Sequence, residues 1–141
     1  MHLVRFKAYG HENVIGNHKT TVEITTEDFL TKQGTCIVGV QATEKLSELS
    51  SEIRALASLE TTKIVLVMDV AGIKEQVSGT GGSALTYADS VSMVARTSLF
   101  QCGRTLMVNA DKAASDLSRE FVNQLSEKGI EMDCELHFIP E

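Results

Sequence analysis

Two stretches of the chain decide the fold, because they read as two versions of one unit. Residues 37–56 are IVGVQATEKLSELSSEIRAL, and residues 105–124 are TLMVNADKAASDLSREFVNQ. A shift of 68 positions aligns them, since Ala42 then falls on Ala110 and Glu52 on Glu120. The other identical pairs are Val40/Val108, Ser47/Ser115, Leu49/Leu117 and Ser50/Ser118. An internal repeat of this kind predicts two halves with a common architecture.

Each copy of the unit begins as a short apolar strand and continues as a helix. The apolar residues of both copies are spaced by three and four positions, which is typical of one helix face. They are Leu46, Leu49, Ile53 and Leu56 in the first copy and Ala114, Leu117, Phe121 and Leu125 in the second. We expect Thr43 to cap the first helix and Asp111 the second.

The segments around these units alternate between apolar and polar residues, which predicts strands. The expected strands are 3–9, 20–25, 36–40, 63–70, 73–78, 91–96, 105–110 and 130–139. The strand at 63–70 is nearly all apolar, as expected for burial on both faces.

The pattern therefore predicts one α+β, mainly β domain over residues 1–141, with pseudo-symmetric halves at approximately 1–72 and 73–141. Each half contains one strand–helix–strand unit, and the strands would form a barrel or a sandwich with the helices packed outside. A split βαβ sheet resembling ferredoxin-like folds is the alternative.

Composition narrows the functional classes. The net charge of −6 disfavours broad nucleic-acid binding, which needs a basic footprint. Three cysteines without a CxxC motif indicate a reducing compartment, and we expect Cys36, Cys102 and Cys134 to be buried apolar thiols. The N-terminus carries no apolar signal segment, and no apolar run is long enough to span a membrane. We therefore expect a cytoplasmic protein.

Short motifs in both halves resemble one archaeal family. In the first half these are GHEN at 10–13, NHKTTVE at 17–23, LT at 30–31 and GTCIVGV at 34–40; in the second half they are SMV at 92–94, Arg96, Ser98, CGRTLMV at 102–108 and ADKAA at 110–114. Together they resemble the family catalogued as domain of unknown function 371, over nearly the whole chain. The resemblance implies a compact, mainly β cytosolic protein and carries no established activity or catalytic residue. That family often has proline after the first Gly-His, where this chain has Glu12.

His11 and His18 are the first candidates for chemistry. They flank a polar loop in which Gly10 and Gly16 would allow a tight bend. With Glu12 they would form a His/carboxylate site for a divalent metal. The alternatives are that both rings hydrogen-bond the backbone and hold the loop, or that they contact a ligand. If the protein is catalytic, His18 is our candidate general base, because imidazole titrates near neutrality.

A comparison of the halves with a gap of three residues extends this hypothesis. The resulting pairs are Gly10/Gly81, His11/Gly82 and His18/Asp89. If a two-fold axis brings the loops together, His11, His18 and Asp89 share one cleft. The alternative is that the loops lie at opposite ends of the molecule.

Other residues suit a phosphate or a carboxylate. Lys19 and Thr20 follow the histidines, and the loop 79–83 with Gly81 and Gly82 offers backbone N–H groups to an anion. This loop is not a P-loop, because no Gly-Lys-Ser/Thr ends it. Arg96 and Arg104 flank a second-half strand, and arginine forks bind the same anions, although surface ion pairing is the ordinary alternative.

The leading hypothesis is a small protein that binds a small anionic ligand or a metal through His11, His18 and Lys19, with help from the 79–83 loop. No nucleophilic triad or Gly-x-Ser-x-Gly motif is present. Catalysis is therefore possible but has no assigned residues. The rival is a non-catalytic interaction module, part of an assembly or RNA-associated. Its basic patch would contain Arg5, Lys7, Lys19, Arg96 and Arg104. A homodimer whose loops meet at the interface is a third hypothesis.

Overall fold

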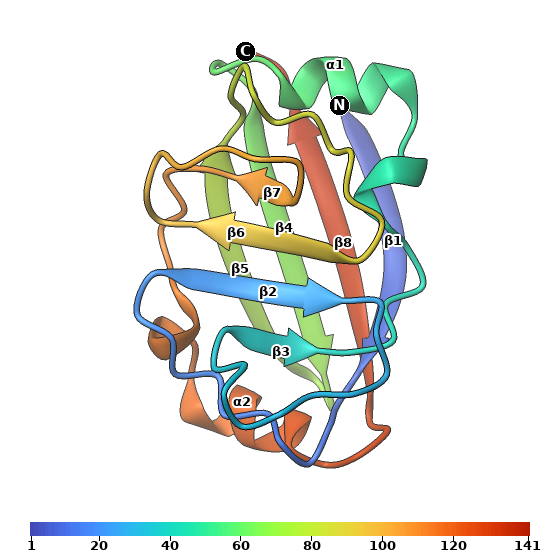
Figure 1. Ribbon diagram of the computed structural model, residues 1–141, viewed down its shortest axis with the longest axis vertical. Coiled ribbons are helices and arrows are strands. Elements are labelled where there is room, and N and C mark those ends of the chain that lie inside the picture. The colour runs from blue at the N-terminus through green and yellow to red at the C-terminus, as the bar shows by residue number, and fades with distance from the viewer.

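The computed structural model describes all residues from Met1 to Glu141 and contains two four-stranded sheets stacked face to face. Sheet A has the order β1 (His2–Tyr9), β8 (Glu131–Ile139), β4 (Lys63–Val70) and β5 (Ile73–Thr80). Sheet B has the order β3 (Ile37–Gly39), β2 (Thr21–Thr25), β6 (Ser92–Arg96) and β7 (Thr105–Met107). The strands of sheet B cross those of sheet A in Figure 1. The mainly β α+β prediction is confirmed, as two separate sheets and not as a closed barrel.

Sheet A is antiparallel throughout, whereas sheet B joins two parallel outer pairs through a central antiparallel pair, β2 with β6. A two-residue hairpin connects β4 to β5, and both of its residues have positive φ angles, 53° at Ala71 and 80° at Gly72. These angles match a type I′ turn, which suits the right-handed twist of a hairpin.

Exchanging the halves leaves the strand order of both sheets unchanged, because β1 to β4 then take the places of β5 to β8. The hydrogen bonds correspond as well. Tyr9 N donates to the carbonyl of Val40 at 2.8 Å, and Thr80 N donates to the carbonyl of Val108 at 2.9 Å. The halves therefore share a topology, while a spatial two-fold axis between them stays a prediction.

Two seven-residue helices, α1 (Ser51–Ala57) and α2 (Arg119–Leu125), lie at opposite ends of the long axis (Figure 1). A single 3-10 turn precedes each helix, η1 (Leu46–Glu48) and η2 (Ala114–Asp116). Neither helix is long and apolar enough to cross a membrane.

The predicted helix caps are wrong. The backbone returns to the extended region at Leu49 and Leu117, so the helices begin later, after Ser50 and Ser118. Thr43 accepts a hydrogen bond from the backbone N–H of β1 instead, and Asp111 does the same for β5. The predicted cap residues therefore hold the chain to the edges of sheet A.

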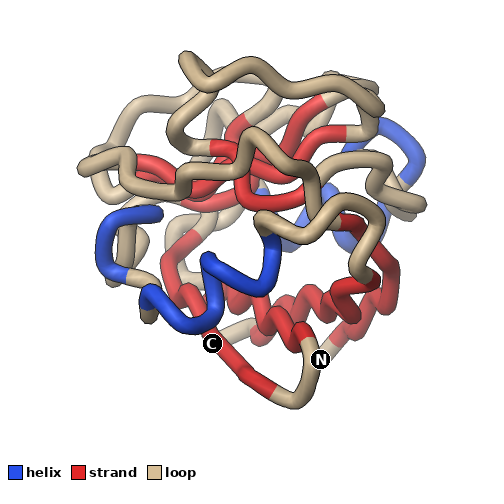
Figure 2. The backbone as a smooth tube through the Cα atoms, turned by 90° about the horizontal axis from the view of Figure 1, so that it is seen from below, coloured by secondary structure: helices blue, strands red, loops and turns tan.

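The core fills the space between the sheets and is largely aliphatic. The alternation predicted for β8 is confirmed, since Met132, Cys134, Leu136 and Phe138 are all buried. The prediction that β4 is buried on both faces is wrong for most of its outer side. Val65 is buried there, but Val67 and Asp69 are half-buried and Lys63 is exposed. In Figure 2 loops lie over the sheet B side, while the strands of sheet A form the opposite surface. The outer side of sheet B is therefore the covered one, and a polar residue such as Thr105 is fully buried there.

Candidate functional site

The two predicted metal ligands, His11 and His18, each close a local turn. His11 Nδ1 accepts a hydrogen bond from Asn13 N at 3.0 Å. His18 Nδ1 accepts one from Thr20 N at 3.2 Å and lies 3.1 Å from Thr21 Oγ1. Each ring thus uses one nitrogen on its own loop. No group of three or more His, Cys, Asp or Glu side chains is arranged to hold a metal ion, and metal binding at these histidines stays a prediction.

The glycine-rich loop lies apart from the histidine loop. Gly81 N donates to the carbonyl of Thr62 and Gly82 N to that of Ala57, which places this loop against the end of α1. His11 N donates to the carbonyl of Leu125, at the end of α2. Because the two helices lie at opposite ends of the molecule (Figure 1), Gly81 and Gly82 do not join His11 in one anion site.

Asp89 does not join the histidines either, so the predicted common cleft is wrong. Asp89 Oδ2 accepts hydrogen bonds from Val91 N and Ser92 N, at the start of β6. His18 lies at the start of β2. Since β2 and β6 are antiparallel, with Thr21 opposite Arg96, the two strand starts are at opposite ends of the pair.

Arg96 is the predicted site residue whose surroundings best suit a ligand. Its Nε donates to Thr105 Oγ1 at 2.9 Å, and its Cζ lies 4.9 Å from the centre of the Phe100 ring. The half-buried guanidinium is therefore held by a hydroxyl and an aromatic ring. None of the seven ion pairs of the protein includes it.

Cys102 completes this arrangement. Its Sγ lies 3.5 Å from Arg96 Nη2 and 3.5 Å from Thr105 Oγ1. Partial burial raises the pKa of the Cys102 thiol, but the Thr105 hydroxyl, the Arg104 backbone N–H and the Arg96 guanidinium outweigh it and lower that pKa to about 7. We refer to Arg96, Phe100, Cys102 and Thr105 as the Arg96 cluster.

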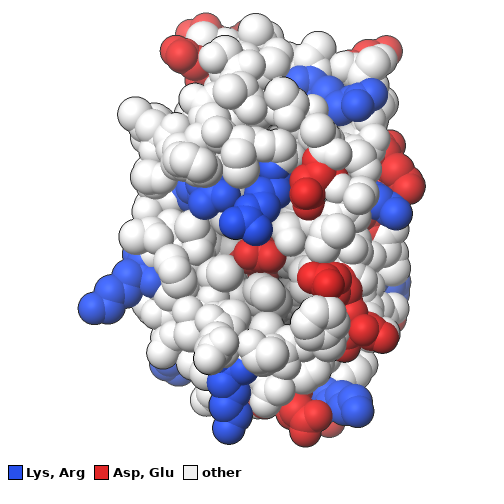
Figure 3. Space-filling model, in the orientation of Figure 1, with Lys and Arg blue, Asp and Glu red and all other residues white.

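The ends of β2 and β6 bring further predicted residues towards this cluster. Thr97 donates through both its backbone N and its Oγ1 to the carbonyl of Thr20, at 3.0 Å each. The turn closed by His18, with the exposed Lys19, therefore sits beside the end of β6 that carries Arg96. The carbonyl of Arg104, also exposed, accepts from Val94 N. Figure 3 shows basic side chains gathered over β6 and β7 on this face, with acidic groups beside and below them.

A half-buried carboxylate occupies the β3 side of the same sheet. Glu23 accepts hydrogen bonds from the Cys36 thiol at 3.4 Å and from Ser92 Oγ at 2.8 Å. Burial and the negative charge of Glu23 raise the pKa of Cys36 to about 11. Two cysteines at opposite edges of sheet B thus have opposite pKa shifts. Burial and Glu23 raise the pKa of Cys36, whereas the hydrogen bonds from Thr105, the Arg104 backbone and Arg96 lower the pKa of Cys102.

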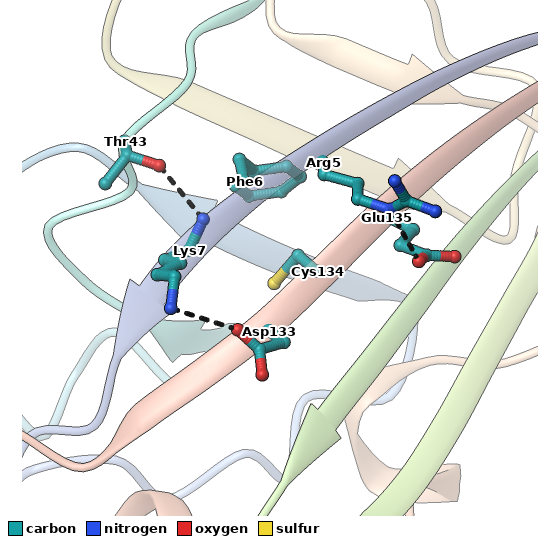
Figure 4. Close-up of a pocket in the computed structure, with 7 residues that line it drawn as sticks. All are labelled: Arg5, Phe6, Lys7, Thr43, Asp133, Cys134 and Glu135. Carbon is teal, nitrogen blue, oxygen red and sulfur yellow. Dashed lines mark hydrogen bonds and ion pairs between the residues drawn. The ribbon is translucent and has the colours of Figure 1, made fainter.

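An open groove of about 480 Å³ lies along β1 and β8 on the other sheet (Figure 4). Its charged side chains neutralise one another. Arg5 Nε lies 3.2 Å from Glu135, and Lys7 Nζ lies 2.9 Å from Glu131 and 3.5 Å from Asp133. The groove therefore presents paired charges to solvent and no cation free for an anion.

The positions of Arg5 and Lys7 also test whether the basic patch of the interaction-module hypothesis is formed. Arg5 and Lys7 alternate with the buried Phe6 and Ala8, so they point outward from sheet A. Arg96 ends β6 and Arg104 directly precedes β7, so both lie at sheet B, on the other side of the core. The five basic residues do not share one face, and that patch is not formed.

Sequence reasoning missed the cysteine of the cluster. Cys36 and Cys102 are both half-buried, so the expectation of buried apolar thiols holds only for Cys134, and the pKa of the Cys102 thiol is also lowered. A signal was present, because Cys102 and Thr105 lie in the four-residue run CGRT close to Arg96. What the sequence did not reveal is that this run turns back on itself, with Thr105 N donating to the carbonyl of Cys102.

The fold and the cluster define a small two-sheet α+β protein that carries an arginine–cysteine pair on one sheet. Residues 6–139 match the model of the family described as domain of unknown function, DUF371. The chain is also 43% identical over 121 residues to an uncharacterised protein of Methanocaldococcus jannaschii, covering 86% of this chain and 89% of that relative. The chain belongs to the DUF371 family.

Proposed function

We propose that the protein binds a small anionic ligand, a phosphate or a carboxylate, at Arg96. The observation that carries the proposal is that this guanidinium is fixed in place and yet has no carboxylate partner. In a chain with 19 acidic residues, an arginine positioned without an acidic partner is a ready receptor for an anion from solution.

The geometry of the guanidinium supports this role. Its Nε is occupied by Thr105 and its Nη2 contacts only the Cys102 sulfur, while no protein group accepts a hydrogen bond from Nη1. Phosphate and carboxylate oxygens accept two parallel hydrogen bonds from such a fork. Because Thr105 and Phe100 already hold the side chain, binding costs little side-chain entropy.

The surroundings favour an anion as well. Lys19 and Arg104 are exposed and belong to none of the ion pairs. They add positive potential near the Arg96 cluster even though the whole chain is acidic.

Isothermal titration of the wild type with inorganic phosphate and with malonate tests the proposal. We expect one site in the wild type and at least tenfold weaker binding in Arg96→Gln, about 1.4 kcal/mol of binding free energy. Arg54→Gln is the matched control, because Arg54 is an exposed arginine on α1 without an ion pair. It should bind like the wild type.

A second variant distinguishes a loss of binding in Arg96→Gln from a loss of folding. Arg96→Lys keeps the charge and loses the planar fork, so it should bind at an intermediate affinity with an unchanged circular dichroism spectrum. Absence of binding of either anion to the wild type, or equal affinities in the wild type and Arg96→Gln, would overturn the proposal.

A further inference from the structure

We propose that Cys102 is a nucleophilic thiol that exchanges with a low-molecular-weight disulfide bearing a carboxylate or a phosphate. This inference rests on the proposed function, because Arg96 would hold the anionic group of that disulfide. It adds a covalent step and a substrate class to the same site.

The cluster places a nucleophile and an anion receptor side by side. Arg96 Nη2 is 3.5 Å from Cys102 Sγ, so a ligand bound to the guanidinium fork lies next to the sulfur. Cys102 and Gly103 are half-buried and the following Arg104 is exposed, so the residue that carries the thiol lies at the protein surface. A methyl group added at Gly103 would make ordinary van der Waals contact with Ala88 and Thr86 at 3.6 Å, so this turn packs on the neighbouring loop without crowding.

The other two cysteines lack these features. Cys134 is 1% exposed in the core, where burial raises its thiol pKa. Cys36 donates its proton to Glu23, and its pKa of about 11 keeps it a thiol at neutral pH. With a pKa of about 7, Cys102 is roughly half thiolate at neutral pH, and the thiolate is the attacking species.

The exchange step is balanced. The Cys102 thiolate attacks one sulfur of the disulfide, and a new S–S bond forms as the old one breaks. The second half of the small molecule leaves as a thiolate with the electron pair of the broken bond. The protein thiol is oxidised to a mixed disulfide and the leaving half is reduced, so no other reactant is needed.

The fold favours a mixed disulfide over an internal one. All three cysteines are free. Cys36 directly precedes β3 at one edge of sheet B, and Cys102 precedes β7 at the opposite edge. No resolving cysteine is therefore at hand to displace the small molecule, and the adduct should persist until an external thiol removes it.

Three aliphatic disulfides that differ in charge test the inference: anionic dithiodiglycolate, neutral hydroxyethyl disulfide and cationic cystamine. Adduct formation on the full chain is followed by intact mass spectrometry, with peptide mapping to locate the modified cysteine. We expect one adduct, on Cys102, formed at least tenfold faster with dithiodiglycolate than with cystamine. Arg96→Gln should lose this preference, Arg54→Gln should keep it, and Cys102→Ser should form no rapid adduct.

The neutral disulfide carries no anionic group for Arg96 to bind, so its rate reports only how readily the Cys102 thiolate forms. This rate should rise with pH through about 7 in the wild type, and the rise should move to higher pH in Arg96→Gln, because the guanidinium stabilises the thiolate. A buried structural cysteine would show neither change.

Thiol exchange at Cys102 and anion binding at Arg96 are measured separately. Equal rates with the three disulfides, or an adduct on Cys36 first, overturn the thiol proposal even when the wild type binds phosphate by calorimetry and Arg96→Gln does not. If the wild type binds neither phosphate nor malonate, the proposed function is overturned, and the exchange proposal with it.

Discussion

The two halves of the molecule share a strand topology but have two different polar surfaces. Where the second half has Arg96 at the end of β6, the first half has Thr25 at the end of β2. Thr25 is buried, and its hydroxyl accepts from Glu27 N and donates to the carbonyl of Val91. In the first half the side chain at this position is thus hydrogen-bonded to the backbone, whereas in the second half it is a guanidinium that has no acidic partner. The difference places the proposed chemistry in the second half.

A second pair of positions shows one structural task solved by two side chains. His18 and Asp89 each precede a sheet B strand, and each accepts a hydrogen bond from the backbone N–H two residues later. Their own carbonyls accept from Ser115 N and Ser47 N, which are an identical pair of the repeat. Because an aspartate makes the same backbone hydrogen bonds in the second half, the comparison supports the alternative that His18 stabilises its turn.

The largest effect should come from Gly10 and Gly81, each of which packs one half against the end of the helix of the other half. A side chain at Gly10 would strike the carbonyl oxygens of Leu125 and Glu127, and one at Gly81 would strike those of Ala57 and Leu59. The backbone cannot give way cheaply at either site. We expect Gly10→Ala and Gly81→Ala each to lower the free energy of unfolding by about 3 kcal/mol in urea titrations.

Gly103→Ala is the control, because its new methyl group would meet nothing closer than 3.6 Å. It should stay within about 0.5 kcal/mol of the wild type. A loss at only one of Gly10 and Gly81 would break the comparison, since it would mean that the halves share a chain path without sharing its packing.

This shared plan could be predicted from the sequence because the repeat preserves the groups that set the path. The identical Ser50 and Ser118, and the apolar spacing behind them, predicted two matching helices. The helix starts could not be predicted, because a 3-10 turn followed by an extended residue has no strong pattern of its own. Thr43 and Asp111 resemble caps in sequence, and only the tertiary structure turns them towards strand edges.

Removing the Glu75 carboxylate should have an intermediate effect on stability, and its contacts exist only in the second half. The carboxylate lies 2.8 Å from Lys112 Nζ and accepts from Ser118 N, whereas the corresponding residue of the first half is Val4. The Glu75 side chain is 11% exposed. We expect Glu75→Gln to cost about 1.5 kcal/mol of unfolding free energy, at the low end for charged hydrogen bonds because Lys112 is one-third exposed.

The same residue predicts a pH dependence. Burial raises the pKa of Glu75, but the bonds from Lys112 and the Ser118 N–H outweigh it, so the folded pKa lies below the ordinary 4.5. The stabilisation is therefore complete above pH 4.5 and is lost as the pH falls through the folded pKa. Urea titrations at stepped pH should show a shallower acid loss in Glu75→Gln, and an unchanged one in Glu60→Gln, an exposed carboxylate without an ion pair.

The Arg96 cluster was only partly predictable. Arg96 entered the candidate set because arginine suits anions, and the same reasoning chose Gly81 and Gly82, which the fold places against the end of α1, away from His11. Residue type shows what a side chain can bind but not which neighbours already occupy it. Arg5 and Arg96 are alike in sequence, and only the structure shows that one faces Glu135 and the other a thiol and a hydroxyl.

The smallest effect should be the most equal between the halves. Ser50 Oγ accepts from Ile53 N at 3.2 Å, and Ser118 Oγ accepts from Phe121 N at 3.1 Å. Each bond satisfies one helix N–H that has no partner within the helix, so Ser50→Ala and Ser118→Ala should each cost about 1 kcal/mol. Ser51→Ala is the control, because Ser51 is exposed and makes no capping bond.

The Glu75 contact sharpens this last comparison. Glu75 binds the backbone N–H of Ser118, which Ser118→Ala retains, so the extra bond of the second half should not change the cost of losing the hydroxyl. Urea titrations of both single variants and of the double variant should therefore give equal and additive losses, since the two helices lie at opposite ends of the molecule (Figure 1). A markedly larger loss for Ser118→Ala would show that Glu75 and the cap act as one unit, and that the halves differ in how their helices begin as well as in their surface chemistry.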